Sequence, residues 1–332
     1  MKKFIIITSI NSPTKAVLRF SKLNDWQLVV VGDKKTPKNW SCKNTIYISP
    51  ADQEKLGFNI SKILPWNHYC RKMIGYLYAI KNGADIIVDT DDDNIPNKNW
   101  DFPPLYGVFD LTSKNLNFIN IYNNFSSKKI WPRGLPLEKI NKLQKINNKI
   151  YKTNKLSQIG IWQGLADEDP DVDAIYRLVD NTPCYFNKRS PVVLNEGTVS
   201  PFNSQNTLFT KEFFMLLFLP AFVTFRTTDI MRGLVAQPIL WTKNFRLGFT
   251  QATVIQKRNP HDYLKDFKSE VPLFLNSQKI LNIATESVNK SNKNEINLMN
   301  IYKNLYKEKL VEKKELELLK AWILDINNLK NI

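Results

Sequence analysis

A short apolar strand that runs into a dense cluster of acids constrains this chain more than any other feature of its sequence. Residues 86–88 are Ile, Ile and Val, and four of the next five residues are aspartates. Like charges packed together repel one another, and the repulsion rises as solvent is excluded. The cluster therefore predicts a bound divalent cation, because Mg²⁺ and Mn²⁺ prefer carboxylate oxygens and often share their coordination shell with phosphate.

The spacing of the aspartates predicts the directions in which their side chains point. Residues at i and i+2 of an extended segment point the same way, so Asp89, Asp91 and Asp93 are expected in one row, with Asp92 pointing away. We predict that Asp91 and Asp93 bind Mn²⁺ or Mg²⁺. Asp89 and Asp92 are predicted to belong to the same metal–diphosphate site.

Three other interpretations of the cluster are weaker. A solvated acidic turn is disfavoured because the apolar residues before it imply burial at its base. An EF-hand calcium loop needs Gly and Glu at its sixth and twelfth positions, where this chain has Asn94 and Trp100. A phosphatase aspartate pair usually follows the first strand and has Thr or Val at the place that Asp93 occupies here.

The N-terminal third of the chain alternates short apolar strands with helices. The expected strands are residues 4–7, 26–31, 45–48 and 84–88. Ser12 and Pro13 predict the start of a helix, since they favour an N-cap and a first turn, and a longer helix over residues 66–80 is expected to end at Gly83 in a left-handed cap. Continuous apolar strands alternating with helices predict an α/β fold with a parallel sheet covered on both faces.

Polar residues gather at one edge of that predicted sheet. Ligands of parallel sheets bind beyond the carboxyl ends of the strands. Thr8, Ser9, Asp33 and the aspartate cluster all fall at that edge. The sequence therefore predicts a ligand site there, with Thr8 and Ser9 among the residues that contact the ligand.

This arrangement resembles the GT-A fold, the Rossmann-like fold of nucleotide-sugar glycosyltransferases. In that fold an Asp-x-Asp motif after the fourth strand holds the metal that bridges the nucleotide diphosphate. The resemblance implies that Asp33 contacts the base or ribose and that Arg71 and Lys72, on the helix before the motif, face the phosphates. A solvated helix face is the alternative for both basic residues.

Two later blocks resemble particular families. Residues 160–165 and 171–174 are similar to a block of the plant reversibly glycosylated polypeptides, which are UDP-arabinopyranose mutases, and Arg133 falls where that family has an arginine-bearing segment. Residues 256–262, together with the triple aspartate, look closer to the STELLO glycosyltransferases. The likeness covers about residues 1–272 and implies a fold and a reaction class rather than a particular substrate.

The second acid-rich block also predicts a sugar site from its own residues. Carboxylates and amides bind sugar hydroxyls, and an aromatic face packs on the sugar ring. Asp171, Asp173 and Trp162 offer these groups, and Arg133 and Asn203 are predicted to line the same pocket. An acidic surface loop is the alternative for the block, and a turn is the alternative for Asn203.

An acid follows the longest apolar stretch of the chain. The GT-A resemblance implies that Asp229, at a helix start between Arg226 and Arg232, deprotonates the acceptor hydroxyl of an inverting enzyme. General-base help of this kind raises a rate by about a hundred- to ten-thousand-fold. Arg232 is predicted to contact the substrate. Alternatively, Thr228 caps the helix and Asp229 complements the helix dipole.

The same resemblance implies roles for two later residues. Many GT-A enzymes use a late histidine as a further metal ligand, and His261 is the candidate in this chain, with Gln256 as the competing position. Arg258 is predicted to neutralise the leaving diphosphate, as a fixed cation does in phosphate chemistry.

Composition limits the ligands and the cellular compartment that are expected for the protein. The formal net charge of +16 suits phosphorylated substrates or anionic lipid surfaces, with compositional drift as the alternative. Nucleic-acid binding is disfavoured by the acid clusters. Three scattered cysteines favour a reducing cytoplasm. No secretory signal is expected, and the apolar stretch at residues 213–225 contains Pro220 and is too short to span a bilayer.

We therefore predict two structural units and one activity. Residues 1–275 form a GT-A domain, and residues 276–332 form a C-terminal helical extension packed on it. The protein is predicted to be a cytoplasmic, metal-dependent glycosyltransferase, with a peripheral association with the inner membrane surface as an option. It moves a sugar from a nucleoside diphosphate sugar, preferably UDP-linked, to a glycan or lipid-linked acceptor in surface-polysaccharide synthesis. The alternative is a nucleotide-sugar mutase, which uses the same pocket without a foreign acceptor.

Overall fold

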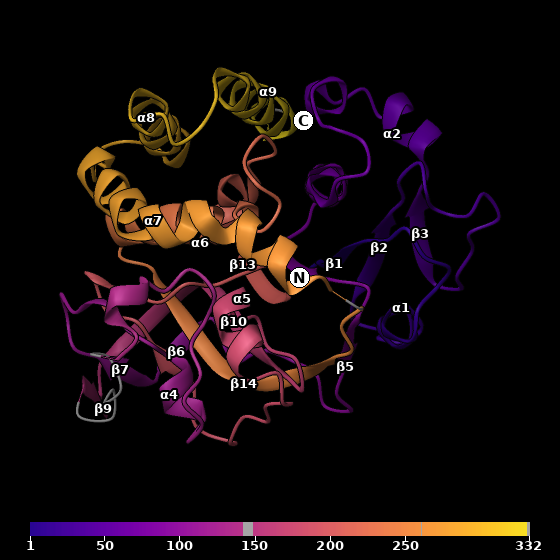
Figure 1. The fold of residues 1–332 in the computed structure, drawn as a ribbon. Coiled ribbons are helices and arrows are strands. Elements are labelled where there is room, and N and C mark those ends of the chain that lie inside the picture. Colours follow the sequence, from indigo (N-terminus) through magenta and orange to yellow (C-terminus); the bar gives the residue numbers. More distant parts are fainter. Residues whose placement is uncertain (142–148, 260, 331–332) are drawn as a thin grey trace.

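The computed structural model describes residues 1–141, 149–259 and 261–330 and shows a mixed α/β architecture with one large sheet (Figure 1). In chain order, the strands are β1 (Lys3–Thr8), β2 (Gln27–Val31), β3 (Thr45–Ile48), β4 (Ile86–Thr90), β5 (Asn94–Pro96), β6 (Tyr106–Val108), β7 (Asp110–Thr112), β8 (Asn117–Phe118), β9 (Ile150–Tyr151), β10 (Leu156–Asp167), β11 (Val192–Val193), β12 (Thr198–Val199), β13 (Asn206–Thr210) and β14 (Arg246–Gln256). The α-helices are α1 (Lys15–Phe20), α2 (Pro50–Lys55), α3 (Lys72–Lys81), α4 (Tyr122–Phe125), α5 (Ala174–Val179), α6 (Thr228–Thr242), α7 (Tyr263–Ser287), α8 (Asn294–Lys307) and α9 (Lys313–Lys330). Short 3₁₀ helices are η1 (Asn59–Lys62), η2 (Tyr69–Arg71), η3 (Leu137–Lys139) and η5 (Lys211–Leu217). The predicted fold class, an α/β protein with a central sheet and C-terminal helices, is confirmed.

The sheet joins a parallel half to a mixed half. Its strand order is β3-β2-β1-β4-β13-β10-β14-β11-β7-β9, with β5 paired to β14 and β6 paired to β10. β3, β2, β1 and β4 are all parallel, as their continuous apolar sequences predict. β13 then runs antiparallel to both β4 and β10, so it connects the acid-bearing strand to the second half of the sheet.

The helices predicted in the N-terminal half are present, but their observed bounds differ from the predicted ones. α1 begins later than the signal at residues 12–13 predicts, because the hydroxyl of Thr14 caps it by accepting the N–H of Val17. The predicted helix over residues 66–80 is shorter as well, since the chain turns through η2 before α3 begins. Gly83 follows the end of α3 with a φ of +78°, which is the expected left-handed conformation.

Both faces of the sheet are covered by apolar side chains. On one face, α3, α6 and the C-terminal helices bury a large cluster that includes Met73, Phe213 and Trp322. On the other face, α1 packs with Trp100 and Trp162 over β1 and β4. Because both faces are occupied, the carboxyl ends of the strands are the place where a ligand can reach the sheet.

The C-terminal helices pack against the sheet domain as part of the same body. α7, α8 and α9 lie together along one side of the molecule (Figure 1), and α9 reaches back to η1. The carboxylate of Asp325 on α9 accepts the backbone N–H groups of Asn59 and Ile60 at 2.9 and 3.0 Å. The predicted division between residues 275 and 276 falls inside α7, so no element boundary marks it.

The burial of Trp322 indicates that α9 contributes directly to stability. Its indole is fully buried and donates to the carbonyl of Met215 at 3.0 Å. Trp322→Ala should lower the free energy of unfolding by about 3–5 kcal/mol, the usual cost of removing a large buried aromatic side chain. Urea denaturation followed by circular dichroism measures this change. Leu324→Ala, at a half-exposed position of the same helix, is the control and should cost about 1 kcal/mol or less. Equal effects of the two substitutions would contradict this packing of α9.

Candidate active site

A cavity of about 560 Å³ opens at the carboxyl edge of the parallel strands. Its walls come from the ends of β1 and β2, from the turn after β4, and from arginines and acids of later segments. The predicted site residues that line it are Thr8, Ser9, Asp33, Asp91, Asp92, Asp93, Arg133, Asp171, Asp229, Arg258 and His261. The fold therefore brings most of the predicted site residues to one place.

The acid cluster forms a turn and not an extended row. β4 ends before Asp91, and the chain bends into β5, so Asp91, Asp92 and Asp93 all line the cavity. Asp92 accepts hydrogen bonds from the hydroxyl of Ser9 and from the side-chain amide of Asn11. The prediction that Asp92 points away is wrong, because the alternation of side-chain directions stops where the strand ends.

Asp89 lies beneath the cavity and not in it. Its side chain is fully buried, and its two oxygens pair with the ammonium of Lys72 at 2.8 Å and with Nη1 of Arg232 at 2.7 Å. Burial would raise the pKa of Asp89, but these two positive charges lower it below its usual value. Asp89, Lys72 and Arg232 form a buried ion cluster, and the structure does not bring Asp89 or Arg232 to the ligand contacts predicted for them.

Lys72 joins this buried ion cluster to the acid turn. Its ammonium also contacts Oδ1 of Asp91 at 2.7 Å and the carbonyl oxygen of Thr90 at 2.8 Å. Burial would lower the pKa of Lys72, but the charges of Asp89 and Asp91 raise it. The ammonium is fully buried among these three acceptors, and Lys72 does not line the cavity. The predicted phosphate contact of Lys72 is therefore corrected: Lys72 pairs with buried carboxylates and positions Asp91.

Arg71 also lies outside the cavity. Its guanidinium stacks on Trp66, with 3.4 Å between Cζ and the ring centroid. It donates to the side-chain oxygen of Gln53 at 2.7 Å and to the carbonyl of Leu64 at 3.1 Å. The predicted phosphate contact of Arg71 is replaced by a structural one, because these buried partners hold the guanidinium against the segment that precedes α3.

Asp91 and Asp93 are the side chains best placed to hold a divalent cation. Burial raises the pKa of Asp91 to about 7, and the charges of Asp93 and Asp89 act in the same direction against the opposing charge of Lys72. Burial also raises the pKa of Asp93, whose Oδ1 is buried without a hydrogen-bond partner. A cation bound to both carboxylates would satisfy that oxygen and relieve the repulsion. In the described part of the chain no group of three or more His, Cys, Asp and Glu side chains could hold a metal, so phosphate oxygens and water would complete the shell, as is usual for Mg²⁺.

His261 lines the cavity but has a carboxylate partner of its own. Its Nδ1 lies 2.9 Å from Oδ2 of Asp266. Burial would raise the pKa of Asp266, but the hydrogen bond of His261 and the charge of Arg226 lower it. The metal contact of His261 stays a prediction.

Two arginines from later segments bring positive charge to the cavity. Arg226 pairs with Glu270 at 2.8 Å, and Arg258 pairs with Asp169 at 3.2 Å. Burial lowers the pKa of Arg258, and the nearby charge of Arg226 acts in the same direction. Nη1 of Arg258 is buried and has no hydrogen-bond partner. A buried cationic donor without a partner suits a ligand anion.

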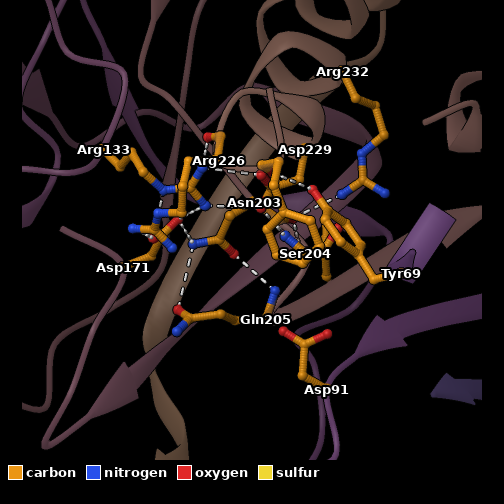
Figure 2. Close-up of polar contacts among 12 residues, drawn as sticks. Tyr69, Asp91, Arg133, Asp171, Asn203, Ser204, Gln205, Arg226, Asp229 and Arg232 are labelled. Carbon is orange, nitrogen blue, oxygen red and sulfur yellow. Dashed lines mark hydrogen bonds and ion pairs between the residues drawn. The ribbon is translucent and has the colours of Figure 1, made fainter. Parts of the chain in front are cut away.

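Arg133 holds two carboxylates at once (Figure 2). Its guanidinium donates to both oxygens of Asp171 at 2.8 Å and to both oxygens of Asp229 at 3.1 Å. Burial would raise the pKa of Asp171, but the charges of Arg133 and Arg226 lower it to about 2. Asn203 donates to Oδ2 of Asp171 at 3.0 Å. Segments that lie far apart in the sequence are thereby fixed around one cation.

Trp162 and Asp173 have structural roles. Trp162 is fully buried in the core, with its ring centroid 5.2 Å from that of Phe109. Asp173 is the N-cap of α5, where it accepts the N–H of Tyr176 at 2.8 Å and the indole N–H of Trp131 at 2.6 Å, and burial raises its pKa to about 6. The predicted sugar contacts of both residues are therefore corrected, because neither side chain lines the cavity.

Four cavity residues give only weak signals in the sequence. Asn11, His68, Tyr69 and Phe225 line the cavity, yet none of them lies in an acid-rich block. His68 is held there because its Nδ1 caps η2 by accepting the N–H of Cys70 at 3.1 Å. Position is a signal for two of them, since Asn11 follows the first strand and His68 precedes the basic residues at the start of α3.

Comparison with known proteins identifies the relatives of the chain. The sequence profile of the STELLO glycosyltransferases matches residues 226–331. The chain is 33% identical over 261 residues to a protein of Arabidopsis thaliana named "Probable glycosyltransferase STELLO1". It is 31% identical over 301 residues to the "Probable glycosyltransferase STELLO2" of the same plant. Over these residues the chain is similar to the STELLO glycosyltransferases.

The STELLO resemblance predicted from the sequence is thereby confirmed. The two matches cover 72% and 84% of this chain. The chain spans only 33% and 39% of the length of these relatives. The profile match contains Asp229 and Arg258 and continues through the C-terminal helices, so the STELLO-like region includes both cavity residues and the elements that pack behind them.

The structural role of Lys72 can be measured. Lys72→Met removes the ammonium, keeps an apolar stem of similar length, and leaves Asp89 with one cationic partner fewer in the core. Breaking a buried ion pair usually costs about 3–5 kcal/mol, so the free energy of unfolding should fall by that amount in chemical denaturation. Lys81→Met, at the exposed end of α3, is the control and should stay within about 0.5 kcal/mol of wild type. Unchanged stability of Lys72→Met together with lost UDP binding would instead favour a phosphate contact.

Proposed function

We propose that this chain transfers a sugar from a nucleoside diphosphate sugar to a glycan or lipid-linked acceptor. The observation that carries the proposal is the cavity at the strand ends, where the acid turn at residues 91–93 shares one space with Arg226 and Arg258. A metal-bound diphosphate needs carboxylates for its cation and fixed cations for its own oxygens. The names of the STELLO relatives, which are probable glycosyltransferases, support the reaction class.

The donor is proposed to bind with its nucleoside at the ends of β1 and β2. Thr8, Ser9 and Asp33 line the cavity there. The carboxylate of Asp33 accepts the backbone N–H groups of Lys34 at 2.6 Å and His68 at 3.2 Å, which fixes its orientation. A fixed acceptor suits a ring N–H or a ribose hydroxyl. Uracil offers such a ring N–H, and UDP is therefore the proposed nucleotide.

A divalent cation, Mn²⁺ or Mg²⁺, is proposed to bind Asp91 and Asp93. When bound, it would neutralise the diphosphate and make it a better leaving group. Lys72 fixes Asp91, and the side-chain amide of Gln256 donates to Asp93 at 3.2 Å, so both carboxylates are held in place without the ion. Arg258 is proposed to bind the departing diphosphate through its unpaired Nη1.

Asp229 is proposed as the base that accepts the proton of the acceptor hydroxyl. It lies in the first turn of α6 and lines the cavity. Both of its oxygens are hydrogen-bonded to Arg133, and the backbone N–H of Ser204 donates to Oδ2 at 3.3 Å. Arg133 makes shorter contacts with Asp171. Asp229 can therefore turn toward an acceptor hydroxyl without leaving the guanidinium unpaired.

Surface-polysaccharide synthesis in the cytoplasm is the proposed setting. Cys42, Cys70 and Cys184 are free thiols, which suits a reducing compartment. The net charge of +16 supports a peripheral contact with anionic lipid and hence a lipid-linked acceptor.

None of the helices within the described ranges is long and apolar enough to cross a membrane.

Nucleotide binding is expected to depend on metal through the acid turn. Asp91→Asn and Asp93→Asn remove a charge with little change of shape and relieve repulsion, so both variants should fold. Each should abolish the rise in melting temperature that UDP with Mn²⁺ gives to the wild type in a thermal-shift assay. Asp101→Asn, an exposed acid outside the cavity, is the control and should keep that rise. Equal stabilisation by UDP in the presence of EDTA would remove the basis of the metal assignment.

Asp229→Asn should slow transfer while donor binding is retained. The amide keeps the size of the carboxylate but cannot accept the proton, so turnover should fall by about two to four orders of magnitude. Release of UDP with glycan and lipid acceptor fractions measures the rate, and the thermal shift with UDP and Mn²⁺ checks donor binding. NMR of the product reads the anomeric configuration, since a retaining enzyme would tolerate the substitution.

Two outcomes would change the assignment. Near-normal turnover of an inverting Asp229→Asn enzyme would make Asp229 a structural partner of Arg133. Rapid interconversion of pyranose and furanose forms of a UDP-sugar by the wild type, without any acceptor, would contradict the transferase and favour a nucleotide-sugar mutase.

A further inference from the structure

Three aromatic side chains meet at the cavity beside the proposed base. The ring centroids of Tyr69 and Phe225 are 4.7 Å apart, those of His68 and Phe225 are 5.2 Å apart, and those of His68 and Tyr69 are 5.3 Å apart. All three residues line the cavity together with Asp229. The side chains of this aromatic cluster, defined as His68, Tyr69 and Phe225, have no role in the donor chemistry derived above, in which only the backbone N–H of His68 takes part by orienting Asp33.

Phe225 differs from the first part of the apolar stretch at residues 213–225, to which it belongs. Residues 213–219 are buried in the core, whereas 52% of the surface of Phe225 is exposed. Leaving a large ring in water forgoes about 25 cal/mol of stabilisation for each Å² that could have been buried. An aromatic ring left in water on the wall of a ligand-sized cavity offers a face on which a ligand can pack.

Hydrogen bonds from α9 and from Tyr69 hold the backbone of the segment that carries Phe225. The buried carboxylate of Glu315, on α9, accepts the backbone N–H groups of Ala221 at 3.0 Å and Phe222 at 2.8 Å. The hydroxyl of Tyr69 donates to the carbonyl of Phe225 at 3.3 Å. The exposed ring is therefore presented by an anchored backbone, and a ligand that packs on it has little backbone freedom to remove.

The aromatic cluster lies on the acceptor side of the proposed site. Phe225 immediately precedes Arg226 and the first turn of α6, which carries Asp229. Burial raises the pKa of the Tyr69 hydroxyl well above its usual value, and the nearby negative charge of Asp229 raises it further. The proposed nucleoside contacts come instead from the ends of β1 and β2. A sugar whose hydroxyl approaches Asp229 would therefore lie close to the aromatic cluster.

We propose that Phe225, backed by Tyr69 and His68, forms an acceptor subsite that binds a sugar ring through its C–H face. This inference rests on the proposed glycosyltransferase function. Pyranose faces consist largely of C–H bonds and pack on an aromatic ring, while the hydroxyls at the sugar edge stay free for hydrogen bonds. Arg226 and Asp229 are the polar groups that would meet those hydroxyls. The subsite thus identifies the acceptor as a carbohydrate, rather than a protein hydroxyl or a bare lipid phosphate.

Saturation-transfer difference NMR tests the subsite with defined probes. The probes are the methyl pyranosides of glucose, galactose, mannose and xylose, each added to the full chain with UDP and Mn²⁺. With the wild type, at least one probe should receive saturation mainly at the C–H protons of one ring face. Phe225→Ala should reduce that transfer at least threefold, and Phe225→Tyr, which keeps the ring, should preserve it.

A control variant and a second measurement separate the subsite from the donor site. Tyr185→Ala removes an aromatic ring that is 62% exposed but lies outside the cavity, and it should leave the sugar signals unchanged. The thermal shift caused by UDP and Mn²⁺ should be the same in Phe225→Ala and in the wild type.

Four results would overturn the subsite or its basis. Equal saturation transfer in Phe225→Ala and wild type, or no transfer to any probe while UDP and Mn²⁺ still stabilise the protein, would show that the ring binds no sugar. Loss of the UDP shift in Phe225→Ala would place the ring against the nucleobase instead. Absence of the UDP shift in the wild type would contradict the proposed function itself, so the two failures are distinguishable.

Discussion

The buried ion cluster of Asp89, Lys72 and Arg232 is the interaction on which the rest of the site depends. It joins β4, α3 and α6 through side chains that have almost no exposed surface. A buried charge that loses its partner is strongly destabilising, so the three elements are held in one arrangement. Lys72 extends the cluster to Asp91, and Arg232 donates to the carbonyl of Asn203 at 2.9 Å. A pairing in the core thereby positions the acid turn and the segment that leads into β13.

Charges of both signs line one cavity above that cluster. The acid turn lies at the end of β4, and Arg133, Arg226 and Arg258 come from later segments, each paired with a carboxylate. A cation bound to a diphosphate is itself an ion pair. A cavity wall with both positive and negative side chains therefore complements it better than a wall whose charges all have the same sign. On one side of the cavity the charges are balanced by shared pairing: Arg133 donates to both Asp171 and Asp229, while Nη1 of Arg258 remains unpaired.

The C-terminal helices complete the site instead of extending a finished domain. α9 supplies Glu315 to the backbone that leads to Phe225, and it supplies Asp325 to the backbone of η1. Both carboxylates are buried and accept N–H groups that would otherwise lack partners. The STELLO profile spans residues 226–331, so it contains the segment that carries Asp229 together with the helix that anchors the preceding loop. The positioning role of α9 is a physical reason for these elements to occur as one unit.

The parallel strands, the edge at which they end, and the acids gathered there follow from the sequence alone, because apolar runs and neighbouring residues are local properties. Thr8, Asp33 and the turn at residues 91–93 lie at the predicted edge for this reason. Which polar groups face the cavity and which neutralise one another in the core depends on the packing of segments that are distant in the sequence. Arg232 reaches Asp89 across 143 positions of the chain, and no spacing rule shows such a partner. Trp162 likewise has the residue type of a sugar platform but the environment of a core residue, because burial is set by packing between distant elements and not by the local sequence.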